Sequence, residues 1–263
     1  MRSLYVAATG MKAQQTNMDV IANNLANVNT TGYKRGRADF EDLLYQTMRP
    51  VGAAATASTE VPTGVYVGLG SRLASTSKIF GQGAAKMTES WSDISIEGDG
   101  FFQVQMPDGT TAFTRAGAFK QDTNGNLVTM NGDPVTPNIT IPATADPESI
   151  YVASDGTITY RTSGTNVATT AGQLQLARFI NPAGLQAMGS NLFVETTPSG
   201  SPVVGVPGLN GFGKTVGGMI EMSNVNIVDE LVGMIFGQRA YEINSKAIQT
   251  SDQMLQTAVE VKR

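Results

Sequence analysis

Residues 4–28 of the chain read LYVAATGMKAQQTNMDVIANNLANV, and a seven-residue repeat runs through them. Residues spaced in this way fall along one side of an α-helix that pairs with another helix. The first row of the repeat contains Leu4, Met11, Met18 and Leu25, and the second row contains Ala7, Gln14, Ile21 and Val28. The pattern predicts an N-terminal helix with a coiled-coil seam along these two rows.

The end of this helix is marked by residues that favour turns. Thr30 and Thr31 are poor helix formers, and Gly32 suits the left-handed backbone conformation that commonly follows a helix. We therefore expect the helix to stop between Asn29 and Gly32.

The C-terminal residues 226–261 repeat the arrangement. Asn226 is a good N-cap, and Asp229 and Glu230 complement the positive end of the helix dipole. One row of the predicted seam contains Ile227, Met234, Tyr241, Ile248 and Leu255, and the second contains Leu231, Gln238, Ser245, Asp252 and Val259. These rows predict a second helix that needs a partner, because an isolated coiled coil with polar seam residues is marginal.

Two interpretations of the pairing remain open. In the first, the two terminal helices pack on each other within one subunit. In the second, which we favour, polar side chains beside the apolar rows also hydrogen-bond to neighbouring subunits, as register-specific contacts in an assembly do. These side chains are Gln14, Gln15, Asn17, Asn23, Asn24, Asn27, Gln238, Asn244 and Gln249.

The middle of the chain has a different pattern. Residues 46–64 are rich in Pro, Gly, Ala and Thr and indicate a loop or linker. From Trp91 to about Met219, short runs of alternating apolar residues are separated by turn signals such as Asn124-Gly125 and Asp155-Gly156. We therefore expect an α+β fold in four segments: residues 1–45 and 220–263 form a helical domain, 46–90 form an extended linker, and 91–219 form an inserted β-rich domain.

Composition narrows the classes of function. The 263 residues include no Cys and no His, which excludes imidazole and thiolate chemistry and the usual zinc sites. The formal net charge of −4 gives no overall attraction for nucleic acid. The N-terminal residues lack the apolar core of a cleavable signal peptide, and no run is long enough to span a membrane. These observations favour a protein that is not an enzyme.

One string resembles a nucleotide-binding motif. Residues 208–215, GLNGFGKT, fit the P-loop pattern with Lys214 and Thr215 at its end. A P-loop leads directly into a helix, but Val216, Gly217 and Gly218 follow here and make a poor first turn. A glycine-rich turn is the favoured interpretation, and nucleotide binding is kept as a remote alternative.

The two ends of the chain resemble a known family. Residues 17–35, NMDVIANNLANVNTTGYKR, are similar to the rod signature of bacterial flagellar rod and hook proteins. Residues 223–255 resemble that family's C-terminal signature, and residues 98–129 resemble the opening of its β-domain. The core of the N-terminal signature consists of Ala22, Asn23, Asn24, Leu25, Ala26 and Asn27, followed by Gly32. Residues 40–64 are similar to the distal-rod version, so the hook protein or another rod subunit is the alternative within the family.

The resemblance implies a structural subunit of the flagellar distal rod, which polymerises helically into a stiff shaft that transmits torque. It implies export without a cleaved signal peptide, a place in the basal body across the periplasm, and no catalytic residue or cofactor. Implied partners are other copies of the chain, proximal rod proteins, the hook protein, the ring proteins around the rod and the flagellar export apparatus. The predicted seam residues for assembly are Leu4, Met11, Met18, Ile21, Leu25, Val28, Leu231, Met234, Tyr241, Ile248 and Leu255.

Overall fold

The computed structural model describes residues 2–52, 54–56, 59–60, 62–162 and 167–261. Tertiary contacts divide the chain into two compact units. We call the first the helical unit; it contains Met1–Ala26, Gly36–Lys78 and Asn226–Arg263. The second, the β unit, contains Asn27–Arg35 and Ile79–Val225.

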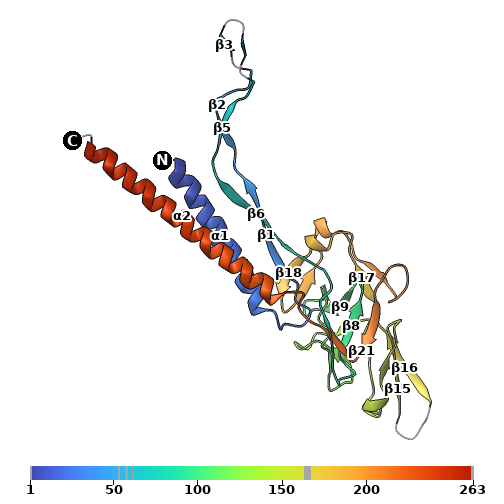
Figure 1. Cartoon of the computed structure of the whole chain (residues 1–263). Helices are drawn as coiled ribbons and strands as arrows, with labels where there is room; N and C mark the ends of the chain where they lie inside the picture. The colour runs from blue at the N-terminus through green and yellow to red at the C-terminus, as the bar shows by residue number, and fades with distance from the viewer. Residues whose placement is uncertain (1, 53, 57–58, 61, 163–166, 262–263) are drawn as a thin grey trace. The chain divides into compact units, whose positions relative to one another are not determined.

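Two long helices dominate the helical unit. Helix α1 spans Arg2–Ala26 and α2 spans Ile227–Val261, and they lie side by side in opposite directions with both chain ends at the same end of the pair (Figure 1). The Asn226 side chain caps α2 by accepting a hydrogen bond of 3.1 Å from the Val228 amide. The predicted α+β class and the pairing of the terminal helices are therefore confirmed. Helix α1 ends before the predicted stop, although Gly32 does adopt a left-handed φ of 70°.

A two-stranded antiparallel ribbon forms the rest of the helical unit. Strand β1 (Gly36–Asp42) pairs with β6 (Ser71–Lys78), β2 (Tyr45–Arg49) pairs with β5 (Val65–Gly68), and β3 (Ala54–Thr56) pairs with β4 (Thr59–Glu60). The prediction of a loop or linker over residues 46–64 is therefore wrong for the paired strands, although residues 53, 57–58 and 61 lie outside the described part. The predicted domain boundaries stay a prediction, because contacts within one structure do not test which segments fold alone.

The β unit is built from short antiparallel strands. Its largest sheet has the order β18 (Gln186–Gly189), β19 (Leu192–Val194), β10 (Thr111–Thr114), β9 (Phe101–Gln105), β17 (Leu176–Arg178) and β20 (Val203–Gly205), with β13 (Val135–Thr136) also pairing with β9. A second sheet contains β14 (Tyr151–Val152), β15 (Thr157–Arg161) and β16 (Ala168–Gln173). The predicted β-rich middle is thus present.

Paired strands and short helices complete the β unit. Strand β8 (Ile94–Glu97) pairs with β21 (Lys214–Gly217), β7 (Ala85–Met87) with β22 (Met219–Glu221), and β11 (Lys120–Gln121) with β12 (Leu127–Val128). The 3-10 helices are η1 (Pro147–Ser149), η2 (Pro182–Gly184) and η3 (Thr197–Ser199). The predicted turns at Asn124-Gly125 and Asp155-Gly156 are confirmed, since both glycines have positive φ, 85° and 81°.

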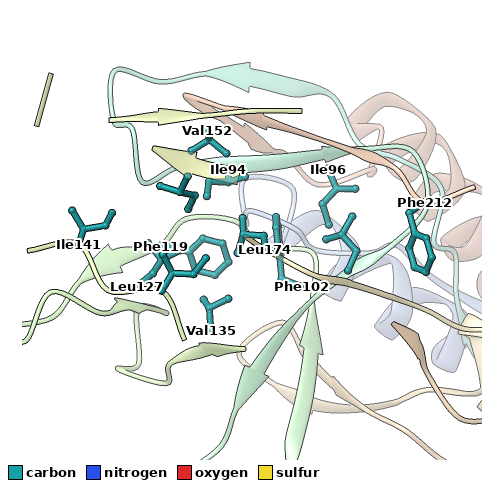
Figure 2. Packing of buried hydrophobic residues seen from close by; sticks show 13 residues of the cluster. Ile94, Ile96, Phe102, Phe119, Leu127, Val135, Ile141, Val152, Leu174 and Phe212 are labelled. Atoms are coloured by element: carbon teal, nitrogen blue, oxygen red, sulfur yellow. The ribbon is translucent and has the colours of Figure 1, made fainter. Parts of the chain in front are cut away.

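Buried apolar side chains from many of these strands form the core of the β unit. Figure 2 shows them gathered in one interior, with Ile94 and Ile96 from β8, Phe102 from β9 and Phe212 before β21. The Phe102 and Phe119 rings meet edge-on at 5.1 Å between centroids. A second cluster of buried aromatic residues lies around Phe101, Phe113, Phe179 and Phe193. Burial of this apolar surface is the main stabilising term for the β unit.

A buried ionic cluster lies inside the same unit. The Glu221 carboxylate accepts a 2.6 Å hydrogen bond from Lys34 Nζ and lies 3.3 Å from Arg115 Nη1. Lys34 Nζ also donates to the Gly81 carbonyl at 2.8 Å, and the Gly83 amide donates to Glu221 at 2.8 Å. Burial lowers the pKa of the Lys34 ammonium, and the neighbouring Glu221 carboxylate partly opposes this shift. One carboxylate therefore serves two buried cations.

This ionic cluster ties together segments that are remote in sequence. Lys34 lies just before the ribbon, Gly81 just after it, and Glu221 shortly before α2. Asn224 makes the same link, because its Oδ1 accepts from the Arg35 amide at 2.7 Å and its Nδ2 donates to the Ile79 carbonyl at 2.8 Å. The β unit therefore holds side by side the three stretches of chain that lead to the helical unit.

No helix in the described ranges is both long and apolar enough to cross a membrane. Those ranges likewise contain no group of acidic side chains placed to hold a metal ion.

We predict that Glu221→Gln lowers the free energy of unfolding by about 3–5 kcal/mol, because it removes the carboxylate charge that both Lys34 and Arg115 contact inside the β unit. Trp91, the only tryptophan, packs against the core of the β unit, so its fluorescence during urea unfolding measures the loss. The matched control is Glu242→Gln, which breaks an ion pair with Arg239 at a side chain that is 63% exposed, against 1% for Glu221. The control should change stability by less than about 1 kcal/mol. Equal effects of the two substitutions would contradict a structural role for the buried cluster.

Candidate assembly surface

The facing sides of α1 and α2 fix the register of the helix pair. Ser3 Oγ lies 3.4 Å from Ser251 Oγ at one end, and Asn24 Nδ2 lies 3.4 Å from Glu230 Oε2 at the other. Between these ends, Gly10 faces Asn244 and Gly237 faces Met18. The sequence positions of each pair add to about the same value, as expected for straight antiparallel helices.

Small and polar residues form the middle of this seam. On α2 the row that faces α1 is Glu230, Gly237, Asn244 and Ser251, at a spacing of seven residues. A Cβ atom at Gly237 would lie 3.1 Å from Met18 Cγ, so the glycine lets the two backbones approach closely. Ala7, Ala13 and Ile21 are the buried hydrophobic residues of α1. The close approach leaves little room for large apolar side chains between the helices.

The apolar residues predicted for the seam therefore lie in several places. Ile21 is buried, and the half-buried residues are Leu4, Met11, Met18, Leu25, Met234 and Ile248. Leu231, Tyr241 and Leu255 are exposed in the single subunit. Val28 lies in the turn after α1 and belongs to the β unit. Their role in contacts between subunits stays a prediction.

Asn24, in the middle of the N-terminal signature, is buried and hydrogen-bonded. Its Oδ1 accepts a 2.8 Å hydrogen bond from the Gly36 amide, and its Nδ2 donates to the Gly36 carbonyl at 2.9 Å. The same side chain reaches Glu230, so it links α1, β1 and α2 within the helical unit. Nearby, Ala22, Asn23 and Ala26 are exposed, Leu25 is half-buried, and Asn27 accepts a 3.2 Å hydrogen bond from Thr30 in the turn.

The side of α2 away from α1 is apolar and exposed. Side chains recur there at three- and four-residue steps, which places them on one face of the helix. Ile235 is 57% exposed and Phe236 is 71% exposed. We call this surface the outer face of α2, and it consists of Val228, Leu231, Val232, Ile235, Phe236 and Ile243. Exposed groups of large apolar side chains on a soluble protein commonly mark sites of contact with another protein.

The ribbon also exposes large apolar side chains, including Leu44, Tyr45, Met48 and Tyr66. An isolated two-stranded ribbon is only marginally stable in water. The outer face of α2 and the ribbon would therefore both be stabilised by contact with another apolar surface.

The P-loop-like string has no phosphate-binding geometry. Gly208 to Gly213 form a turn, and Lys214 begins strand β21, which pairs with β8, so no helix N-terminus faces the glycines. The adjacent cleft of about 490 Å³ is also lined by Glu97 and Asp99, whose carboxylates repel phosphate.

Comparisons with known proteins agree along the whole chain. Residues 4–34 match the family described as flagella basal body rod protein, residues 95–160 match the flagellar hook protein FlgE/F/G D1 domain, and residues 216–261 match the flagellar basal body rod FlgEFG protein C-terminal family. The sequence is 52% identical to the flagellar basal-body rod protein FlgG of Borreliella burgdorferi over 263 residues, covering 100% of this chain and 99% of that protein.

Two further relatives, one rod protein and one hook protein, differ in how much of the chain they match. Identity to the FlgG protein of Buchnera aphidicola subsp. Schizaphis graminum is 52%, covering 97% of both chains. The flagellar hook protein FlgE of Helicobacter mustelae is 45% identical, but the match covers only 50% of this chain and 29% of that protein. The similarity to rod proteins is therefore full-length, whereas this similarity to a hook protein is partial.

We predict that Gly237→Leu destabilises the helix pair by about 1–3 kcal/mol, because the larger side chain must fit where a Cβ atom would already lie 3.1 Å from Met18 Cγ. Thermal unfolding followed by far-ultraviolet circular dichroism measures the change. Gln238→Leu introduces the same side chain one residue later, at an exposed position, and should have almost no effect. If both variants unfold at the parent temperature, the two helices do not pack through Gly237.

Proposed function

Because this chain belongs to the family of flagellar basal-body rod and hook proteins, we propose that it polymerises helically into the distal rod of the bacterial flagellum. In this role it is a structural subunit of a stiff shaft that transmits torque to the hook. Its partners in the basal body would be further copies of itself, proximal rod proteins, the hook protein, the surrounding ring proteins and the export apparatus. The full-length similarity to rod proteins favours the rod over the hook.

The observation that carries this proposal is the exposed outer face of α2. Full burial of a large aliphatic or aromatic side chain contributes roughly 1.5–3 kcal/mol. Six such side chains on one helix face give a neighbouring subunit enough apolar surface to offset the entropy lost on association. The helix pair alone leaves this face in water, so contacts between copies are the state in which it is covered.

The ribbon supports a stiff polymer. Strands β2 and β5 carry exposed apolar side chains on a structure too thin to have its own core. Packed between stacked subunits, these side chains would gain the apolar surface that the ribbon lacks. Such contacts would brace neighbouring subunits against sliding, which a shaft requires and a flexible hook does not.

We further infer that the chain is not an enzyme. It has no His or Cys residue for acid–base, nucleophilic or zinc chemistry. Lys214, at the end of the P-loop-like string, begins strand β21 and lines the same cleft as Glu97 and Asp99.

We predict that Ile235→Asp raises the critical concentration for polymerisation at least about tenfold, since losing 1.4 kcal/mol of contact energy has that effect. Sedimentation and electron microscopy of concentrated protein measure the change, and the parent should form straight filaments. Thr111→Asp, which introduces the same charge at an exposed polar position of the β unit, should polymerise like the parent. The monomeric Ile235→Asp protein should keep its circular dichroism spectrum because the side chain is already exposed. Unimpaired polymerisation of Ile235→Asp would show that the outer face of α2 is not a subunit interface.

For Lys214 we predict no phosphate-binding role. Isothermal titration of the parent with ATP and Mg²⁺ should give no saturable heat, and Lys214→Ala should assemble as the parent does, because the side chain is exposed at the start of a strand. Micromolar binding by the parent that is lost in Lys214→Ala would restore the nucleotide-binding alternative.

A further inference from the structure

A groove runs along the helical unit between α1 and the ribbon. It has a volume of about 460 Å³, and its apolar wall contains Tyr5, Leu43 and Leu73. Gly70, with a φ of 112°, lets the ribbon turn closely over α1, where a Cβ atom would collide with Thr9. A space of this size, lined mainly by apolar atoms, holds several aliphatic side chains.

The charges at the groove are positive. Lys12 and Arg72 line it, together with the neutral residues Thr9, Ala13, Thr16 and Ser71. Arg72 forms an ion pair with Glu41, and within the described ranges Lys12 forms none. An occupant that presents aliphatic side chains beside a carboxylate would therefore complement the groove.

The last turns of α2 carry aliphatic side chains beside a carboxylate. Ser251 lies opposite Ser3, so residues 252–261 continue past Arg2, the first described residue of α1. Leu255 and Val259 follow Ser251 by four and eight residues and extend the side of α2 that faces α1. They are 38% and 67% exposed. Asp252, whose carboxylate accepts a 3.1 Å hydrogen bond from Gln256, lies beside them.

We propose that residues 252–261 of one copy of this chain dock into the groove of a second copy. In this contact Leu255 and Val259 pack against Tyr5 and Leu73, and Asp252 lies near Lys12. The inference rests on the proposed function and names the surfaces of one contact within the polymer. Groove and segment are different surfaces of the same subunit, so each bound copy still offers a free partner for the next. A head-to-tail contact of this kind builds an open filament.

Engineered cysteine pairs test the contact directly, because the chain has no cysteine of its own. The full-length Leu73→Cys, Val259→Cys double variant is polymerised, oxidised and run on a denaturing gel without reductant. Since every subunit carries both positions, we expect a ladder of covalent dimers, trimers and longer chains. Each single variant should remain mostly monomeric on the gel. The matched control combines Val259→Cys with Thr111→Cys, an exposed position in the β unit, and should give no ladder.

The outcomes separate the two proposals. Filaments that form without a ladder, or with equal ladders in the control, overturn docking in the groove and leave the proposed function standing. Failure of the parent protein to form filaments at any concentration overturns the proposed function, and the docking contact with it. A ladder restricted to the Leu73 and Val259 pair supports both.

Discussion

The close approach of α1 and α2 is the constraint from which the surface of the helical unit follows. Gly10, Gly237 and Ser251 bring the helices together, and Asn24 fixes them against β1. Because this seam uses small and polar side chains, the larger apolar residues of α2 are left on the opposite side. A seam of leucines would have buried the large apolar side chains between α1 and α2, and the subunit would then have had no exposed apolar face on α2 to cover. The small and polar residues between the helices therefore determine which apolar residues remain exposed on the outer face of α2.

The chain passes between the two units repeatedly, so the β unit must hold several connecting segments in place. Glu221 and Asn224 gather the segments around Lys34, Gly81 and Ile79 with hydrogen bonds of 2.6–2.8 Å. Burying two cations with one carboxylate is costly, and burial lowers the pKa of Lys34. Apolar residues could fill the same space, but only directional contacts define how three remote segments lie together. We take specificity of this arrangement as the reason for a buried ionic cluster here.

The sequence predicted the elements better than their contacts. Heptad rows located both helices, and turn residues such as Gly125 and Gly156 located the β-rich middle, since these are local signals. The middle of the seam was missed because Gly237 and Asn244 do not stand out in a hydrophobic pattern. Strand β2 was missed because exposure of all its side chains removes the alternation that identifies a strand. The pairing of Lys34 with Glu221, 187 residues apart, leaves no local trace.

Unequal cores suggest how folding and assembly are related. The main cluster of the β unit has 13 buried hydrophobic residues, whereas the described residues of the helical unit bury only Ala7, Ala13 and Ile21. Burial of apolar surface must offset the entropy of ordering the backbone, so the helical unit has a far smaller margin than the β unit. Its helices and ribbon gain most from neighbours. Contacts between copies would then stabilise the helical unit itself. The strength of the polymer would depend on the apolar surfaces of α2 and the ribbon that are exposed in the single subunit.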